Sequence, residues 1–433
     1  MNNRELTERD LKYLWHPCTQ MKDHERLPLI PVRHAEGVWL YDFEGRRYLD
    51  AISSWWVNLF GHGNSRIADA ITRQTRELEH VLLAGFSHLP AIELAEKLVR
   101  ISPGGLEKVF YADNGSSAIE VALKMSYHAH RNLGEERFLF LSLTNSYHGE
   151  TLGALSIGDV ALYKTTYQPL LIRNIQTPVP ENKSPEATDS ALKALEQLLR
   201  ERGEEIAAII VEPIVQGAGG MHMYAPEYLR GARKLTQQYG IHFIADEIMT
   251  GFGRTGTMFA CEQAGISPDF MTLSKGLTGG FLPLSAVLTT DEIYRAFYCD
   301  YAEQKAFLHS HSYTGNPLAC AAALETLKIF EEDNVLEMNR RRISRISKNL
   351  QRFTLLDNVK SIRQTGMIAA VEMLDYPPEE RRGLEVYLYG LEHEVLLRPL
   401  GNVIYFMPPY VITDAQIDMM MEVAYEGIKQ VKK

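Results

Sequence analysis

Short runs of consecutive apolar residues recur along the chain and alternate with segments of helical periodicity. The runs that indicate buried strands lie at residues 108–113, 138–141, 206–211, 242–246 and 270–273. Apolar residues at helical spacing fill residues 66–101, and a second stripe contains Ala118, Ala122, Met125 and Ala129. This alternation predicts a parallel sheet that is covered on both faces by helices, and ligands bind such sheets at the carboxyl ends of the strands.

The two ends of the chain carry a different pattern. Residues 37–42 and 47–50 predict a hairpin around Glu44-Gly45, and residues 366–372 and 403–407 predict two further strands. Residues 331–349 form a charged helical segment. The proline-containing span 176–190 is interpreted as an exposed polar connection.

Composition narrows the class of protein. The 433 residues are enough for two or three domains, and 45% hydrophobic with 23% charged residues is ordinary for a globular enzyme. A net charge of -10 without a basic patch argues against a nucleic-acid partner. The four cysteines show neither metal-ligand nor disulfide spacing, which fits a cytoplasmic location without a metal site. A signal-peptide core and an apolar run of about 20 residues are both missing, so no membrane partner is expected.

Lys275 is the most informative residue. It ends an apolar run and is followed by Gly276-Leu277-Thr278-Gly279-Gly280. An ammonium group is expensive to bury unless its pKa falls or it is paired, and an amine with a lowered pKa can act as a nucleophile toward a carbonyl group. The alternative is a strand-end lysine whose charged head reaches solvent.

A second candidate is an anion site after the strand at 108–113. Asn114-Gly115-Ser116-Ser117 precedes the helical stripe, and Ser117 with Glu120 has capping-box spacing. Free backbone amides and the positive end of the helix dipole would point toward a phosphate. Many helices begin after Gly-Ser, so an ordinary helix start remains the alternative.

Several polar and aromatic residues fall at predicted strand ends or in loops. Asp246 ends an apolar strand and is expected to be at least partly buried, which requires a cationic or protonated partner. Tyr147 could stack on a planar ring, or the neighbouring His148 could act as an acid or base; a surface aromatic loop is the alternative. Of Trp55 and Trp56, one is expected to pack while the other faces a cavity, unless both serve the core.

Residues 251–256 match the pattern G-x-G-x-x-G of dinucleotide-binding sites. The charged pair Asp246-Glu247 and three more residues separate the preceding strand from the first glycine, and no clean helix start follows. A dinucleotide site is therefore disfavoured.

In combination these residues meet the needs of pyridoxal 5'-phosphate: a lysine for the aldehyde, a carboxylate for the ring nitrogen, an anion cradle and an aromatic face. The chain resembles the fold-type I, class-III aminotransferases that act on terminal amines, nearly from end to end. The shared motifs are Asp246-Glu247-Ile248 with residues 251–256, Ser274-Lys275-Gly276, and Thr314-Gly315-Asn316-Pro317.

The resemblance implies a role for each candidate cofactor residue. Lys275 would bind the aldehyde and move the substrate proton, and Asp246 would pair with the ring nitrogen. Tyr147 would stack over the ring. Gly115 and Ser116 would hold the phosphate from one subunit, and Ser310, His311 and Ser312 would reach it from the other subunit of a homodimer.

Further motifs are similar to those of family members in biotin synthesis: residues 15–17, 53–56, 213–221 and 407–410. This similarity implies 8-amino-7-oxononanoate as the amino acceptor. Trp55 would line the substrate channel, and Arg398 would bind the substrate carboxylate.

The sequence departs from the family pattern at three places. Cys18 replaces an active-site tyrosine, Glu150 stands where aspartate is common, and Ser310-His311-Ser312 replaces Gly-Pro-Thr. The resemblance implies S-adenosylmethionine as the amino donor, and the replacement at Cys18 leaves lysine or another diamine-like donor as the rival.

The resemblance also implies an α/β architecture. A large domain, residues 65–330, would surround a mostly parallel seven-stranded sheet, and residues 1–64 and 331–433 would form a smaller α+β domain. Two other classes remain open: a ligand-binding protein without catalysis, and another fold-type I enzyme such as an aminomutase or decarboxylase.

Overall fold

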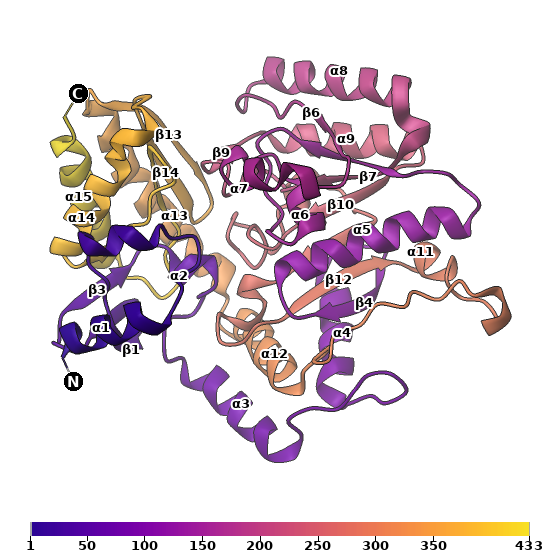
Figure 1. The fold of residues 1–433 in the computed structure, drawn as a ribbon, viewed down its shortest axis with the longest axis horizontal. Coiled ribbons are helices and arrows are strands. Elements are labelled where there is room, and N and C mark those ends of the chain that lie inside the picture. Colours follow the sequence, from indigo (N-terminus) through magenta and orange to yellow (C-terminus); the bar gives the residue numbers. More distant parts are fainter. Residues whose placement is uncertain (1, 433) are drawn as a thin grey trace.

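The computed structural model describes residues 2–432, and its largest element is a seven-stranded sheet (Figure 1). In spatial order the strands are β4 (Leu106–Ala112), β12 (Ser285–Thr290), β11 (Phe270–Leu273), β10 (His242–Asp246), β7 (Ile206–Val211), β5 (Leu139–Leu143) and β6 (Ile175–Thr177). Only β12 runs antiparallel to its neighbours. The predicted α/β class with a mostly parallel sheet of seven strands is confirmed.

Helices cover both faces of this sheet because its strands are apolar on both sides. Along β7 successive residues belong to different cores. Ile210 packs in the core that contains α5 (Gly115–Asn132), and Ile209 belongs to the core that includes α8 (Pro185–Arg202) and α9 (Pro226–Gln238). A strand buried on both faces reads as a continuous apolar run, which is why these strands were visible in the sequence.

The two ends of the chain lie together, on the left of Figure 1. One sheet has the order β1 (Val32–Glu36), β2 (Trp39–Asp42), β3 (Arg47–Asp50) and β15 (Val395–Leu396). A second has the order β13 (Val359–Thr365), β14 (Ile368–Met373) and β16 (Val403–Phe406), beside α13 (Val335–Leu350), α14 (Arg382–Glu392) and α15 (Asp414–Gln430). The parallel pairing of β3 with β15 joins the predicted hairpin to the C-terminal part.

Predictions for three segments need correction. Residues 66–101 form two helices, α3 (Ser65–Glu77) and α4 (Leu89–Ile101), because Leu78 is extended and the His88 side chain caps the second helix. The segment at 331–349 is likewise divided between α12 (Pro317–Glu332) and α13. The span 176–190 is only partly a connection, since β6 ends at Thr177 and Ser184 caps α8.

The start of α5 also differs from its prediction. Asn114, not Ser117, is the N-cap: its side chain accepts a hydrogen bond from the Ser117 amide at 3.0 Å. Glu120 is not a capping-box partner, because its carboxylate accepts from the amides of Gly153 and Ala154 instead. The helix therefore begins earlier, at Gly115.

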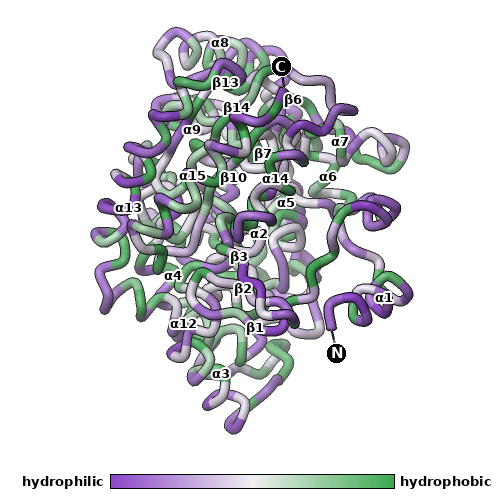
Figure 2. The backbone as a smooth tube through the Cα atoms, turned by 90° about the vertical axis from the view of Figure 1, so that its left-hand side faces the viewer, coloured by the Kyte–Doolittle hydropathy of each residue, from purple (hydrophilic) through white to green (hydrophobic). Residues whose placement is uncertain are grey.

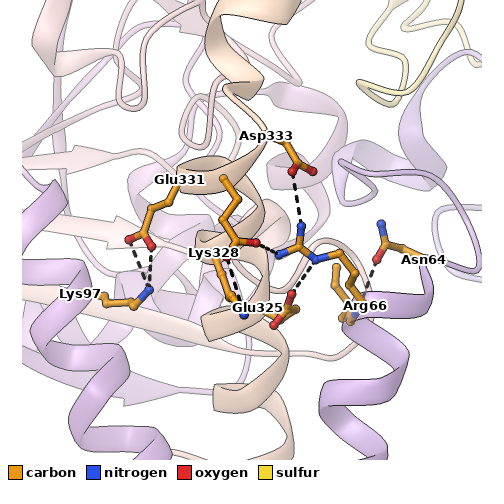
Figure 3. A network of polar contacts seen from close by, with 9 residues as sticks. Asn64, Arg66, Lys97, Glu325, Lys328, Glu331 and Asp333 are labelled. Carbon is orange, nitrogen blue, oxygen red and sulfur yellow. Dashed lines mark hydrogen bonds and ion pairs between the residues drawn. The ribbon is translucent and has the colours of Figure 1, made fainter.

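Ion pairs fasten α3 and α4 to α12, as Figure 3 shows. Arg66 on α3 contacts Glu325 at 2.8 Å and Glu332 at 2.6 Å, and Lys97 on α4 contacts Glu331 at 3.1 Å. These contacts join helices that are more than 200 residues apart in the sequence.

Shorter elements complete the fold. They are α1 (Asn3–Tyr13), α2 (Ser53–Trp56), α6 (Leu152–Ile157), α7 (Ala161–Lys164), α10 (Cys261–Ala264), α11 (Asp291–Arg295), β8 (Val215–Gln216) and β9 (His222–Met223). Helix α1 buries no residue and lies at the periphery of the molecule (Figure 2). Between residues 2 and 432, no helix is both long enough and apolar enough to cross a membrane.

Candidate active site

A cavity of about 180 Å³ lies at the carboxyl ends of β4, β5, β7, β10 and β11. Each of these parallel strands delivers its following residues to the same edge of the sheet. The lining includes five residues predicted from the sequence: Gly115, Ser116, Tyr147, Asp246 and Lys275. The structure thus brings the predicted amine, carboxylate, anion site and aromatic ring together.

Lys275 follows β11 and begins a 3₁₀ turn, Lys275–Thr278. Its φ of 44° lies in the left-handed region, which a non-glycine residue rarely adopts. Burial lowers the pKa of Lys275, and the carboxylates of Asp246 and Glu212 oppose that shift. The Nζ atom lies 5.1 Å from the ring centroid of Trp56. The amine is therefore held against an aromatic face, with a weakened preference for its charged form.

Asp246, at the end of β10, is only 5% exposed. Its Oδ2 lies 2.7 Å from Nδ1 of His148, and its Oδ1 accepts from the Ile248 amide at 3.2 Å. An ionised carboxylate can only accept, so Nδ1 carries the proton of this hydrogen bond. His148 is the partner that a buried aspartate requires, and its Nε2 is buried without a hydrogen-bond partner.

Glu212 is a second buried carboxylate in the lining. It accepts from the Tyr147 amide at 2.9 Å and the Gly217 amide at 2.8 Å. Burial raises the pKa of Glu212 to about 7, against the opposing effect of His148. Glu212 directly follows the apolar run at 206–211, and its hydrogen bonds link this strand end to the Tyr147 and Gly217 loops.

The N-terminus of α5 lies where the sequence predicts an anion site. Asn114 caps the Ser117 amide, and the amides of Gly115 and Ser116 belong to the first turn of the helix. The Glu150 amide donates to Ser116 Oγ at 3.2 Å. A Cβ at Gly149 would lie 2.0 Å from Ser116 Oγ, so only glycine lets this loop approach the helix.

Tyr147 is held at both ends. Its amide donates to Glu212, and its hydroxyl donates to Glu150 Oε1 at 3.0 Å. Burial, reinforced by Glu150, raises the pKa of Tyr147. A neutral ring fixed in this way can present a flat face to the cavity.

Three predicted substrate residues lie outside the cavity lining: Trp55, Arg398 and Cys18. The guanidinium carbon of Arg398 lies 4.4 Å from the Trp55 ring centroid. Cys18 Sγ lies 3.7 Å from Glu150 Oε1. Burial and Glu150 raise the pKa of the Cys18 thiol, while the charge of Arg398 opposes them. Trp55 and Arg398 therefore form one contact pair, and Cys18 reaches Tyr147 through Glu150.

The predicted second phosphate segment is also outside the lining. The amide of His311 donates to Thr314 Oγ1 at 3.1 Å, and the carbonyl of Ser312 contacts His80 Nε2 at 2.7 Å. Ser310 is exposed. Within one chain, this segment does not join the cavity.

Trp56, Asn114 and Thr250 also line the cavity, although no site role was expected for them. Trp56 could have been found, since the two adjacent tryptophans already indicated that one faces a different environment. No local pattern marks Thr250. Residues 251–256 form turns between β10 and α10, and no helix begins within them.

Comparison with known proteins identifies the family. A family model described as aminotransferase class-III matches residues 20–427. The chain belongs to the class-III aminotransferases. It is an aminotransferase, and its family implies pyridoxal 5'-phosphate as the cofactor.

Named relatives of this class-III aminotransferase match over their full length. The adenosylmethionine-8-amino-7-oxononanoate aminotransferase of Helicobacter pylori is 52% identical over 440 residues, covering 100% of both chains. The protein of the same name from Aquifex aeolicus is 43% identical, covering 100% of this chain and 99% of its own.

Solved structures agree with this family. The adenosylmethionine-8-amino-7-oxononanoate aminotransferase of Methanocaldococcus jannaschii superimposes with a TM-score of 0.96 at 38% identity, covering 100% of both chains. An omega transaminase from Pseudomonas jessenii, solved in complex with PMP, has a TM-score of 0.93 at 31% identity and covers 98% of each chain.

Proposed function

We propose that this aminotransferase converts 8-amino-7-oxononanoate to 7,8-diaminononanoate in biotin synthesis, with S-adenosylmethionine as amino donor. The observation that carries the proposal is the full-length identity of 52% to a relative that bears this name. The cavity residues supply the chemistry of amino transfer, and residues beside the cavity offer contacts for a carboxylate-bearing substrate.

The cavity fits pyridoxal 5'-phosphate by the chemistry of its donor set. Lys275 offers an amine for the aldehyde, and Asp246 offers a carboxylate for the ring nitrogen. The amides of Gly115 and Ser116 offer donors for the phosphate. A Cβ at Gly149 would lie 2.0 Å from Ser116 Oγ, so glycine at this position leaves Ser116 undisturbed at the helix N-terminus. Tyr147 supplies the aromatic face.

The bound cofactor supplies an electron sink for charge that develops on the substrate carbon. The residues of the chain contribute charges and hold the reacting groups in position. His148 holds the Asp246 side chain in one orientation through the 2.7 Å bond, and Asp246 lines the cavity. Lys275, with its lowered pKa, can accept a proton and return it. Both groups act in a largely buried site, where charge interactions are stronger than in water.

For the acceptor, Arg398 is the proposed carboxylate ligand, since its planar guanidinium can form two parallel hydrogen bonds. Trp55 fixes this group by stacking at 4.4 Å. The proposed pocket continues toward Cys18 and Glu150, which bond at 3.7 Å.

Two molecules compete as amino donor in this proposal. Cys18 is shorter than the tyrosine that it replaces, which leaves room and removes one hydroxyl. S-adenosylmethionine is our choice, and lysine is the rival. Mixing the pyridoxal form with each donor and following its absorbance in a single turnover discriminates them; conversion with lysine alone would replace the donor and keep the enzyme class.

The acceptor assignment is tested by product analysis. The holoenzyme is incubated with donor and 8-amino-7-oxononanoate, and the products are separated by mass. We expect 7,8-diaminononanoate; its absence, with amino transfer to other oxo compounds intact, would point to a different class-III aminotransferase.

The proposal extends to assembly and organisation. We propose a homodimer in which Ser310, His311 and Ser312 of one subunit complete the phosphate site of the other, which agrees with their position outside the cavity of their own chain. We also propose the domain division at residues 64/65 and 330/331, which the pairing of β3 with β15 supports. The four free cysteines support a cytoplasmic location.

A further inference from the structure

Four consecutive residues beside the cavity have a left-handed backbone. The φ angles of Ser53, Ser54, Trp55 and Trp56 are 52°, 44°, 73° and 74°. None of the four is glycine, so each has a Cβ that disfavours this conformation. Strain of this kind persists only where the surroundings hold it, and such sites are concentrated near functional groups.

The unusual backbone has a consequence for the two tryptophans. In an extended segment, adjacent side chains point to opposite faces. Here the Trp55 ring lies 4.4 Å from the Arg398 guanidinium carbon, and the Trp56 ring lies 5.1 Å from Lys275 Nζ. One turn therefore places neighbouring residues against both the reactive amine and the proposed carboxylate ligand.

Two groups of contacts hold the turn. In the first, Ser54 Oγ donates to Asp50 Oδ2 at 2.8 Å, and His62 Nε2 lies 3.0 Å from the same oxygen. The other oxygen of Asp50 accepts from the Ile52 amide at 3.2 Å. Asp50 is fully buried, so it is a fixed anchor for an exposed serine.

The second group of contacts flanks the turn. Ser53 Oγ donates to the carbonyl of Met407 at 2.7 Å. The fully buried Arg254 donates to the carbonyl of Asn58 at 2.9 Å. Trp56 is buried and its Nε1 donates to the Tyr405 hydroxyl at 3.0 Å. Trp56 is thus fixed by its own hydrogen bond, whereas the Trp55 ring contacts Arg398 and directly follows the Ser54–Asp50 contact in the chain.

We propose that Asp50 and Ser54 are positioning residues, which hold Trp55 against Arg398 by keeping the strained turn from relaxing. Without the Ser54 hydroxyl, the backbone at this position lowers its conformational free energy by leaving the left-handed region, and Trp55 moves with it. The fit of a carboxylate-bearing substrate then changes, while Trp56 and Lys275 stay in place. The identity of that substrate rests on the proposed function; the positioning role does not.

The test compares Ser54→Ala with Ser54→Gly. Both lose the hydroxyl, but alanine keeps the Cβ that disfavours a φ of 44°, and glycine takes this conformation freely. We expect Ser54→Ala to raise the KM for the acceptor about tenfold, because relaxation of one left-handed residue releases enough energy for such a change. The kcat and the cofactor absorbance should stay unchanged. Ser54→Gly should remain within a few-fold of wild type.

Asn334 provides the matched control, since it is exposed, has a φ of 47°, precedes α13 and does not line the cavity. Asn334→Ala should leave KM unchanged. A larger effect for Ser54→Gly than for Ser54→Ala would overturn the proposal, as would wild-type constants in both.

A second readout needs no turnover. The dissociation constant of nonanoate, a simple carboxylate, is measured by tryptophan fluorescence of the holoenzyme. It should rise in the order wild type, Ser54→Gly, Ser54→Ala. If the wild type fails to convert 8-amino-7-oxononanoate but the order holds for nonanoate, the substrate assignment is wrong and the positioning role stands. Equal constants in all three proteins, or no fluorescence response, rejects the positioning role.

Discussion

The Nδ1 atom of His148 lies 2.7 Å from the Oδ2 atom of Asp246, and both side chains are buried at the carboxyl end of the central sheet. His148 comes from the loop after β5, and Asp246 ends β10. This hydrogen bond gives the Asp246 carboxylate one orientation in the cavity. In the proposed function, its charge would face a protonated ring nitrogen.

The first prediction concerns this charge. Asp246→Asn keeps the shape of the side chain and removes its charge, so turnover should fall by about 100- to 1,000-fold, the usual cost of a lost transition-state contact. Single-turnover absorbance measures the step directly. Near-wild-type rates would show that the carboxylate is structural.

The second prediction concerns Arg398. Arg398→Ala should raise the KM for the acceptor strongly and leave the cofactor absorbance unaltered, because the guanidinium contacts Trp55 and does not line the cavity. Arg398→Lys retains the charge without the planar fork and should recover only part of the affinity. Steady-state kinetics at saturating donor tests both, and an altered cofactor spectrum in Arg398→Ala would contradict the assignment.

The third prediction uses Gly149, whose φ is 127°. In Gly149→Ala the new Cβ would meet Ser116 Oγ at 2.0 Å and displace it from the anion cradle, so affinity for pyridoxal 5'-phosphate should fall. Gly134→Ala is the control: its φ is 83°, and nothing lies within 4 Å of the added Cβ. Equilibrium dialysis measures the affinity of both variants for the cofactor. Equal losses of affinity would show that the N-terminus of α5 does not bind the phosphate.

The fourth prediction is a pH dependence of stability at Glu212. Burial raises its pKa from the ordinary 4.5 to about 7. Between these two pH values the folded state retains a proton that the unfolded state has lost. The stabilising contribution of Glu212 is therefore complete below pH 4.5 and is lost as the pH rises toward 7. The total loss is on the order of 3 kcal/mol.

Glu212→Gln removes this ionisation and also one of two accepted amide bonds, a cost that does not depend on pH. From pH 5.5 to 8, the free energy of unfolding should fall more in the wild type than in the variant. Urea unfolding at the two pH values measures the difference. Parallel curves would mean that Glu212 stays ionised when folded.

Candidate residues that lie directly at the end of a predicted strand could be recognised from the sequence alone. Lys275 and Asp246 stand where continuous apolar runs stop, and the cost of burying charge made both conspicuous. The partner of Asp246 was not predictable, because His148 lies 98 positions away and only the pairing of strands brings them together. Glu212 directly follows a predicted strand, but the sequence did not indicate that it accepts hydrogen bonds from two loop amides.

Other predictions were limited because neighbouring residues in the sequence can serve the same structural role. Asn114 and Ser117 can both cap a helix, and the sequence does not say which backbone turns first; the structure selects Asn114. The apolar periodicity at 66–101 gave no sign of the extended stretch that separates α3 from α4. The left-handed turn at Ser53–Trp56 contains no glycine, so its residue types did not indicate this backbone conformation.

The most direct test of the account is to find which lysine carries the cofactor. The holoenzyme is reduced with borohydride, digested, and analysed for the peptide that bears the pyridoxyl group. Burial lowers the pKa of Lys164 and Lys183 as well as that of Lys275, so the experiment has genuine competitors. We expect the label on Lys275 alone. A label on Lys164 or Lys183 with Lys275 unmodified would contradict the proposed active site.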